Sequence, residues 1–321
     1  MKQAKNLSAV GGAMLVIGLL HGCGGGGGGG VATLPTVGST ATPEGPASSS
    51  EPEPASEPIV AVPTPPADTA KDSREPVEGS EPAPSLRAPQ PGSTAAVGND
   101  SEGVYESIFG YAYVSASGKV VRQFNVGLLW GSIDISGSNW IFNPETEYTF
   151  VTVDPVTGSG TFSPKASMDG TYSRRGSASA FGPLTYSFAN ALAVDQTSVA
   201  GTWSTPDTLG MGMSIMVDKT GAFAGSTSGS RIGVCKLSGT LLLAEPDSAK
   251  NAYATTLNAE NAATGTESKC QLLSDMPYVG PSAIVFHPAG RYVTNGYFRT
   301  IALTIRQEGT KASMTNYLQK Q

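Results

Sequence analysis

Apolar and polar residues alternate with a period of two through much of the C-terminal two thirds of the chain. The clearest case is 300–306, where Ile301, Leu303 and Ile305 fall on one face of a strand. Glycine-rich turns separate such runs, and a helical period is nearly absent, with only 257–264 hinting at a helical turn. Many short antiparallel strands at this spacing predict an all-β domain, built either as a barrel or as a sandwich.

The composition changes near residue 100. All ten Phe, eleven Tyr and three Trp lie after it, whereas 23–100 holds fourteen prolines and ten acidic side chains against three basic ones. A segment of this kind cannot bury enough apolar surface to offset its ordering entropy. We therefore expect 23–100 to be a long disordered tether, although its prolines and acids could also bind a partner. The β-rich domain then spans 101–321, as one unit or as two lobes of about 101–192 and 193–321.

The first 22 residues have the layout of a secretory signal peptide, with a basic start, an apolar run and a small residue before Cys23. The apolar run is too short to span a bilayer, which takes about 20 residues. Leu20-His21-Gly22-Cys23 resembles the lipobox of bacterial lipoproteins. The resemblance implies that 1–22 is removed and that Cys23 carries lipid, including palmitate, while Gly24 favours the outer membrane. The alternative is an ordinary exported protein with a stray thiol.

The lipobox resemblance also bears on the other two cysteines. With lipid on Cys23, Cys235 and Cys270 remain as a pair in an oxidising compartment, where we expect them to form a disulfide. Closing this loop of about 35 residues would stabilise the fold by roughly 4 kcal/mol on the chain-entropy model. Two free thiols would instead require a reducing location, which export excludes.

Several motifs resemble a broad group of β-rich proteobacterial lipoproteins that has no assigned activity. In chain order they are Gly201-Thr202-Trp203, the glycine hairpin 221–225, the strand Cys235-Lys236-Leu237-Ser238-Gly239, and Cys270. These motifs are structural, so the resemblance implies a disulfide-bonded β domain on a lipid anchor. A second resemblance rests on the glycine run after Cys23 and on the β character. It is to surface lipoproteins of the transferrin-binding and factor-H-binding type, and it implies a surface receptor.

Candidate catalytic chemistry is sparse. His287 is the only imidazole left after cleavage, and it lies at a strand end where a structural role is the simpler interpretation. Thr227 occupies the position at which a Gly-x-Ser-x-Gly elbow needs serine. Glu145 and Glu147 would share a strand face, and paired carboxylates act in glycosidases, but a solvated strand entrance is the favoured explanation of both. We therefore assign no catalytic residue, cofactor or metal ligand. The three tryptophans are either core residues or the lining of a ligand cavity.

The charge balance excludes one further class of partner. The formal net charge is −6, and the domain after residue 100 carries nearly equal numbers of acidic and basic residues, so no basic surface for nucleic acid is expected. We expect an outer-membrane-anchored, non-enzymatic lipoprotein, on the periplasmic face or at the cell surface, that binds a protein or a small ligand. The alternatives are a surface receptor and a structural envelope protein. Recognition is expected on the loops 138–147, 154–169 and 259–279.

Overall fold

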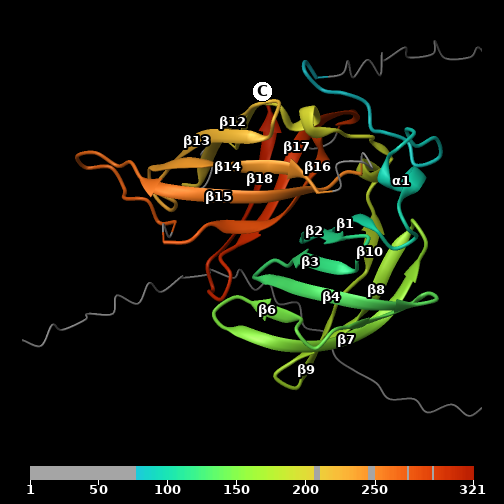
Figure 1. Cartoon of the computed structure of the whole chain (residues 1–321). Helices are drawn as coiled ribbons and strands as arrows, with labels where there is room; N and C mark the ends of the chain where they lie inside the picture. Colours follow the sequence, from blue (N-terminus) through green and yellow to red (C-terminus); the bar gives the residue numbers. More distant parts are fainter. Residues whose placement is uncertain (1–76, 206–209, 245–249, 273–274, 291–292) are drawn as a thin grey trace, which may run out of the picture. The chain divides into compact units, whose positions relative to one another are not determined.

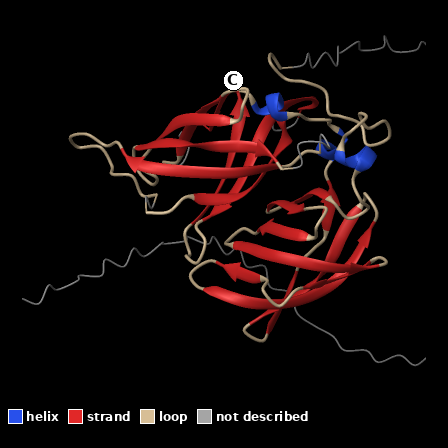
Figure 2. Ribbon diagram, in the orientation of Figure 1, coloured by secondary structure: helices blue, strands red, loops and turns tan. Residues whose placement is uncertain are grey.

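The computed structural model describes residues 77–205, 210–244, 250–272, 275–290 and 293–321. The expected signal peptide, the lipid-bearing cysteine and most of the expected tether lie outside this part of the chain. In the part described, β-strands provide nearly all of the regular structure, as Figure 2 shows, which confirms the all-β expectation. Within the same residues, no helix has the length and apolar character that a membrane span needs.

The N-terminal barrel is formed by the first ten described strands. They are β1 (Gly103–Ser107), β2 (Gly110–Val114), β3 (Lys119–Gln123), β4 (Leu128–Ser136), β5 (Asn139–Phe142), β6 (Glu147–Thr149), β7 (Val153–Ser163), β8 (Ser167–Arg174), β9 (Ser177–Ala180) and β10 (Leu184–Tyr186). All pairings are antiparallel, and the ring runs β1-β2-β3-β4-β6-β7-β8-β10 before returning to β1. Strand β5 bridges β4 and β7, and β9 extends β8 (Figure 1). The order in space therefore departs from the order in the chain.

The C-terminal barrel follows two 3-10 helices, η1 (Phe188–Ala191) and η2 (Gln196–Val199). Its strands are β11 (Gly201–Thr205), β12 (Gly212–Val217), β13 (Ala222–Ser228), β14 (Cys235–Leu243), β15 (Tyr253–Asn261), β16 (Tyr278–Gly290), β17 (Val293–Arg306) and β18 (Ser313–Lys320). Each described strand pairs with its neighbours in the chain, and β11 pairs with β18 to close the barrel (Figure 1). The hint of a helical turn at 257–264 is wrong, because β15 continues through most of it in register with β14.

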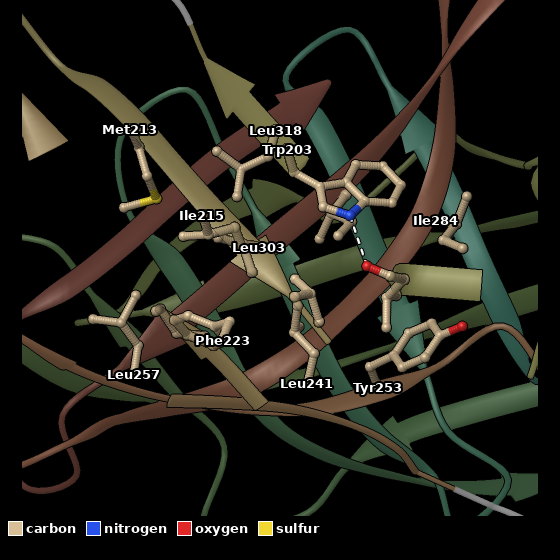
Figure 3. Close-up of a cluster of buried hydrophobic side chains, with 14 of the residues drawn as sticks. Trp203, Met213, Ile215, Phe223, Leu241, Tyr253, Leu257, Ile284, Leu303 and Leu318 are labelled. Carbon is tan, nitrogen blue, oxygen red and sulfur yellow. Dashed lines mark hydrogen bonds between the residues drawn. The ribbon is translucent and has the colours of Figure 1, made fainter. Parts of the chain in front are cut away.

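Aliphatic and aromatic side chains, including one tryptophan, fill the C-terminal barrel. Ile301, Leu303 and Ile305 are buried there, as the alternation in β17 predicts. Trp203 is fully buried, and its indole Nε1 donates a hydrogen bond of 2.7 Å to the carbonyl oxygen of Val199. The side chains labelled in Figure 3 come from all eight strands of this barrel and converge on one core.

Close backbone approaches shape the N-terminal barrel. The segment 154–169, expected as a recognition loop, is instead the hairpin of β7 and β8, and most of 138–147 is β5 with a short turn. The alternation is hidden because glycine occupies inward positions beneath Trp140. A Cβ atom on Gly160 would lie 2.6 Å from the indole, and one on Gly170 would lie 2.5 Å from it. The tryptophan thus packs directly on the backbone of both strands.

Residues 77–100 belong to the packed part of the chain, which differs from the expectation that the tether extends to residue 100. Glu81 and Tyr297 exchange two backbone hydrogen bonds of 2.8 Å, so that Glu81 pairs with β17. The carboxylate of Glu81 also receives hydrogen bonds from Nε and Nη2 of Arg299, at 2.7 and 2.8 Å. Specific hydrogen bonds order this segment where its composition offers little apolar surface. A one-turn helix, α1 (Thr94–Val97), lies at its end.

Both barrels belong to one compact unit of the chain, and polar contacts join them. Lys250 lies 3.2 Å from the carboxylate of Glu102, and both side chains are largely buried. Arg306 of β17 pairs with Glu147 of β6. An ion pair that is shielded from solvent is screened less than a surface pair. These two ion pairs therefore hold the barrels together more firmly than exposed pairs would.

Candidate functional site

The expected disulfide between Cys235 and Cys270 is present. It fastens the loop after β15 to the start of β14, and the backbone amide of Cys270 donates a hydrogen bond of 2.8 Å to the side chain of Asn261. Of the expected recognition loop 259–279, the first residues belong to β15 and the last to β16. The described residues between these strands form a loop tied to the barrel, so this loop is a constrained surface rather than a free one.

His287 lies between aromatic rings and not in an open site. Its ring centroid is 5.3 Å from that of Tyr317 and 6.2 Å from that of Tyr111. Burial lowers the pKa of His287 below its usual value. Its Nε2 is enclosed and makes no hydrogen bond to any described residue. Burial favours the neutral imidazole, and the ring contacts give His287 a packing role.

The remaining catalytic candidates have structural partners. Glu147 is bound to Arg306, and Glu145 is exposed in the preceding turn, so the two carboxylates do not converge. The hydroxyl of Thr227 donates to the carbonyl of Gly233 at 2.8 Å and accepts from the amide of Cys235 at 3.0 Å, which closes a strand end. Within the described ranges, no cluster of three or more His, Cys, Asp or Glu side chains could hold a metal ion.

Two of the tryptophans are core residues, and the third lines a cleft. Trp140 and Trp203 are buried in the two barrels. Trp130 contributes to a cleft of about 530 Å³ that is also lined by Tyr113, Lys119 and Thr256. The guanidinium of Arg306 stacks 4.5 Å from the centre of the Trp130 ring, which fixes the orientation of this wall. The cleft combines an aromatic face with hydroxyl groups, as small-ligand sites do.

Four turns of the N-terminal barrel meet at one end. They are the turns β1–β2, β3–β4, β6–β7 and β8–β9. The registers that bring them together are Ala112↔Arg122, Leu128↔Thr149 and Val156↔Arg174. Each register sets the end of one strand beside the start of another. Turns that are far apart in the chain therefore become neighbours in the barrel.

These turns expose large apolar side chains. We call this surface the apolar end, and its members are Ile108, Phe109, Val126, Phe150 and Val151. Ile108 is 93% exposed and Val151 is 63% exposed, although both are among the residue types most often buried. Single exposed apolar residues are ordinary, but a group of them on adjacent turns is a candidate interaction surface.

An aromatic mouth lies next to the apolar end. It consists of Phe124, Tyr148 and Tyr172, whose ring centroids are 5.4 to 6.1 Å apart. The hydroxyl of Tyr148 donates to the carbonyl oxygen of Val126, which ties the mouth to the β3–β4 turn. The guanidinium of Arg174 lies 4.4 Å from the centre of the Tyr148 ring, a cation–π contact. Aromatic faces and a cation thus border the apolar surface.

Arg122 lies inside the barrel, in contact with this mouth. Its side chain shares the inward face of β3 with Val120 and is only 3% exposed. The guanidinium carbon lies 4.1 Å from the ring centre of Phe124 and 4.9 Å from that of Phe181. Burial lowers the pKa of Arg122 to about 10, partly offset by nearby groups, the largest being Tyr172. The group still carries a positive charge at neutral pH.

The charges around the apolar end are unequally matched. Asp154 binds Arg175 at 2.7 Å, and Glu106, near the β1–β2 turn, accepts a hydrogen bond from Ser187. Arg174 is 4.0 Å from Asp154, at the limit of an ion pair. Arg122 differs from all of these, because its enclosed Nε and Nη1 bond to no described group. The unmatched charge at this end of the barrel is positive.

Sequence reasoning missed both the apolar end and Arg122. A signal for Arg122 exists, since the alternation in 119–123 places an arginine where an apolar residue belongs. Ile108-Phe109 between two strands is also unusual for a turn, where Gly, Pro, Asn, Asp and Ser predominate. Nothing local shows that the four turns lie side by side, because this follows from strand order alone.

Comparison of the chain with protein-family models, with curated proteins and with solved structures finds no match to any of them.

Proposed function

We propose that this chain is an outer-membrane lipoprotein, anchored through lipid on Cys23, that acts as a binding protein without catalytic activity. Its apolar end docks a protein partner whose surface is apolar and carries acidic groups. The lipid anchor rests on the lipobox resemblance, and the tether on the composition. Recognition lies on the turns of the N-terminal barrel in place of the loops expected from the sequence.

The observation that carries the proposal is the gathering of five exposed apolar side chains on adjacent turns. Exposing such side chains to water is unfavourable, and a partner that covers them gains free energy from the water that is released. The partner is expected to be acidic because the unmatched charge beside the surface is positive. The non-enzymatic reading is supported by the enclosure of His287 between tyrosine rings.

Two other functions fit the same anchor. A surface receptor for environmental macromolecules would use the apolar end from outside the cell. A structural envelope protein would have no discrete partner. Protease treatment of intact cells separates the first from a periplasmic protein, because only a surface-exposed domain is cleaved. The cleft beside Trp130 favours a small ligand as a second kind of cargo.

The docking proposal is tested with the partner identified first and its affinity measured afterwards. A photoreactive phenylalanine analogue at Ile108 is used to crosslink the partner in intact cells. The affinity of the purified partner is then measured for the variant Ile108→Ser/Phe109→Ser/Val151→Ser. We expect at least a tenfold loss, because truncation of central interface residues typically costs more than about 1 kcal/mol each.

The matched control places serine at two exposed apolar positions of the C-terminal barrel, Met216→Ser/Leu242→Ser. This variant should retain the affinity of the unaltered protein. Equal affinities for both variants would refute docking at the apolar end. The anchor is tested separately: Cys23→Ser should abolish incorporation of radioactive palmitate, and labelling of that variant would refute lipidation at Cys23.

A further inference from the structure

The guanidinium of Arg122 is a charged group in the interior of the N-terminal barrel, and its burial opposes the stability of the fold. It is almost fully buried, and Nε and Nη1 make no hydrogen bond within the described chain. Buried charges in proteins are normally paired and hydrogen-bonded, because removing them from water is strongly unfavourable. The contacts with Phe124 and Phe181 offset only part of this cost, since ring faces do not replace hydrogen bonds to N–H groups.

The acidic group whose charge acts on Arg122 does not satisfy its hydrogen bonds. Asp169 raises the pKa of the guanidinium through its charge, but it is exposed, and its Oδ1 accepts a hydrogen bond of 2.7 Å from the backbone amide of Gly170. Among the described residues, no carboxylate accepts a hydrogen bond from Nε or Nη1 of Arg122. An apolar residue at this position would complete the core without such a penalty, so an arginine here calls for a role other than packing.

Arg122 is one side chain away from solvent. Phe124 contacts the guanidinium and is itself only half-buried, at the turn that also carries Val126 of the apolar end. A rotation of the Phe124 side chain would therefore open a path from the mouth of the barrel to Arg122. The backbone of Arg122 is fixed by its pairing with Ala112 of β2 and Leu129 of β4.

We infer that Arg122 is the recognition group of an anion site in the mouth of the N-terminal barrel, and that the site takes a carboxylate attached to an apolar group. A planar guanidinium matches a planar carboxylate in hydrogen-bond geometry. The rings of Phe124, Tyr148 and Tyr172 suit the apolar part of the ligand.

The carboxylate has two possible sources, a free small molecule or the chain terminus of a protein partner. The inference goes beyond docking at the apolar end, because a free carboxylate needs no protein partner. Both sources share the chemistry that Arg122 recognises, and the test distinguishes them.

The test follows the Nε–H resonance of Arg122 by NMR in the full mature chain, with assignment by its loss in Arg122→Met. The first arm titrates phenylacetate, with phenylacetamide as the uncharged control and sodium chloride at equal ionic strength. The second arm titrates a short peptide ending in phenylalanine, with the C-terminally amidated peptide as its control. A saturable shift with phenylacetate indicates a free carboxylate, and a shift with the free-acid peptide alone indicates a chain terminus. No shift in either arm, or equal shifts with the amide controls, overturns the inference.

The variants supply a second readout. Arg122→Met should abolish the ligand-dependent change and raise the melting temperature of the ligand-free protein, because it replaces an unpaired buried charge by an apolar side chain. Arg299→Met is the matched control: it removes the partner of Glu81 and should lower the melting temperature while the resonance of Arg122 still responds. A lowered melting temperature for Arg122→Met would show that the arginine is needed for packing, and would count against the inference. The serine variant of the apolar end should keep the NMR response, so that failure of docking and failure of this site remain distinguishable.

Discussion

The two barrels of this protein use the same antiparallel pairing for different ends. In the C-terminal barrel every described strand pairs with its neighbour in the chain, and aliphatic side chains and several aromatic rings, Trp203 among them, form the interior. In the N-terminal barrel the strand order departs from the chain order, and the interior holds clustered aromatic rings and the charged Arg122. Within the described residues, only the N-terminal barrel exposes a group of apolar side chains on adjacent turns.

This difference fits the proposal that the C-terminal barrel supplies stability and the N-terminal barrel supplies recognition. Regular pairing, a disulfide and an apolar interior favour a stable scaffold. A buried charge and exposed apolar turns both oppose stability, which fits the recognition role proposed for the N-terminal barrel. The predictions below test this division, beginning with the scaffold.

The largest loss of stability is expected for Trp203→Ala. The substitution removes a fully buried indole and leaves the carbonyl oxygen of Val199 without its donor. The free energy of unfolding should fall by about 5 kcal/mol, as cavity formation and the lost hydrogen bond combine. Urea unfolding followed by circular dichroism measures it. Met216→Ala, at an exposed position of the same barrel, is the control, and an equal effect of both substitutions would contradict the assignment of Trp203 to the core.

A somewhat smaller loss is expected when the disulfide is removed. Cys235→Ser/Cys270→Ser opens a loop with a sequence separation of 35 residues. On the chain-entropy model this costs about 4 kcal/mol. Differential scanning calorimetry of the variant should show a lower melting temperature that a reducing agent no longer changes. If reduction lowered the melting temperature of the variant as much as that of the parent protein, the effect would not come from this bond.

A modest pH dependence is expected from His287. Burial lowers its pKa in the folded protein, so the unfolded chain binds the proton more readily. Its contribution is therefore complete above about pH 6.5 and is lost as the pH falls below that value, by at most about 1.4 kcal/mol per pH unit. Urea unfolding at pH 7.5 and pH 5.5 measures the loss, and His287→Phe should reduce it. An unchanged pH dependence in that variant would assign the effect to other groups.

The smallest effect on stability is expected at the apolar end. Ile108→Ser and Val151→Ser change side chains that are mostly exposed, so each should alter the free energy of unfolding by no more than about 0.5 kcal/mol. Leu129→Ala, in the core of the same barrel, should cost about 2–5 kcal/mol. A loss at Ile108 as large as that at Leu129 would mean that the turn is part of the fold and not a docking surface.

The sequence predicted those features that depend on local pattern or on residue inventory. Alternation at Ile301, Leu303 and Ile305 marks β17 because one face of that strand is buried along its whole length. The pairing of Cys235 with Cys270 followed from the lipobox resemblance, which leaves two cysteines in an oxidising compartment. Both inferences need only the residues themselves and their compartment.

Other features depend on contacts between distant segments. Gly160 and Gly170 interrupt the alternation of β7 and β8 because Trp140 packs on their backbone. The sequence of this hairpin therefore predicted a loop. Residues 77–100 look like tether by composition, yet Glu81 finds its partner in Arg299, more than two hundred residues away. The apolar end is invisible for the same reason, since strand order alone brings its turns together.

The pairing of Glu81 with Tyr297 and Arg299 of β17 has a mechanical consequence. Tension that enters the chain ahead of Val77 meets two backbone hydrogen bonds and a forked ion pair before it reaches β1. These bonds share the load and pass it to a strand that is itself paired on both sides, in the barrel that the disulfide braces. A pull on the leading segment is therefore borne by the scaffold, and it does not peel the first strand away from the barrel that carries Arg122 and the apolar end.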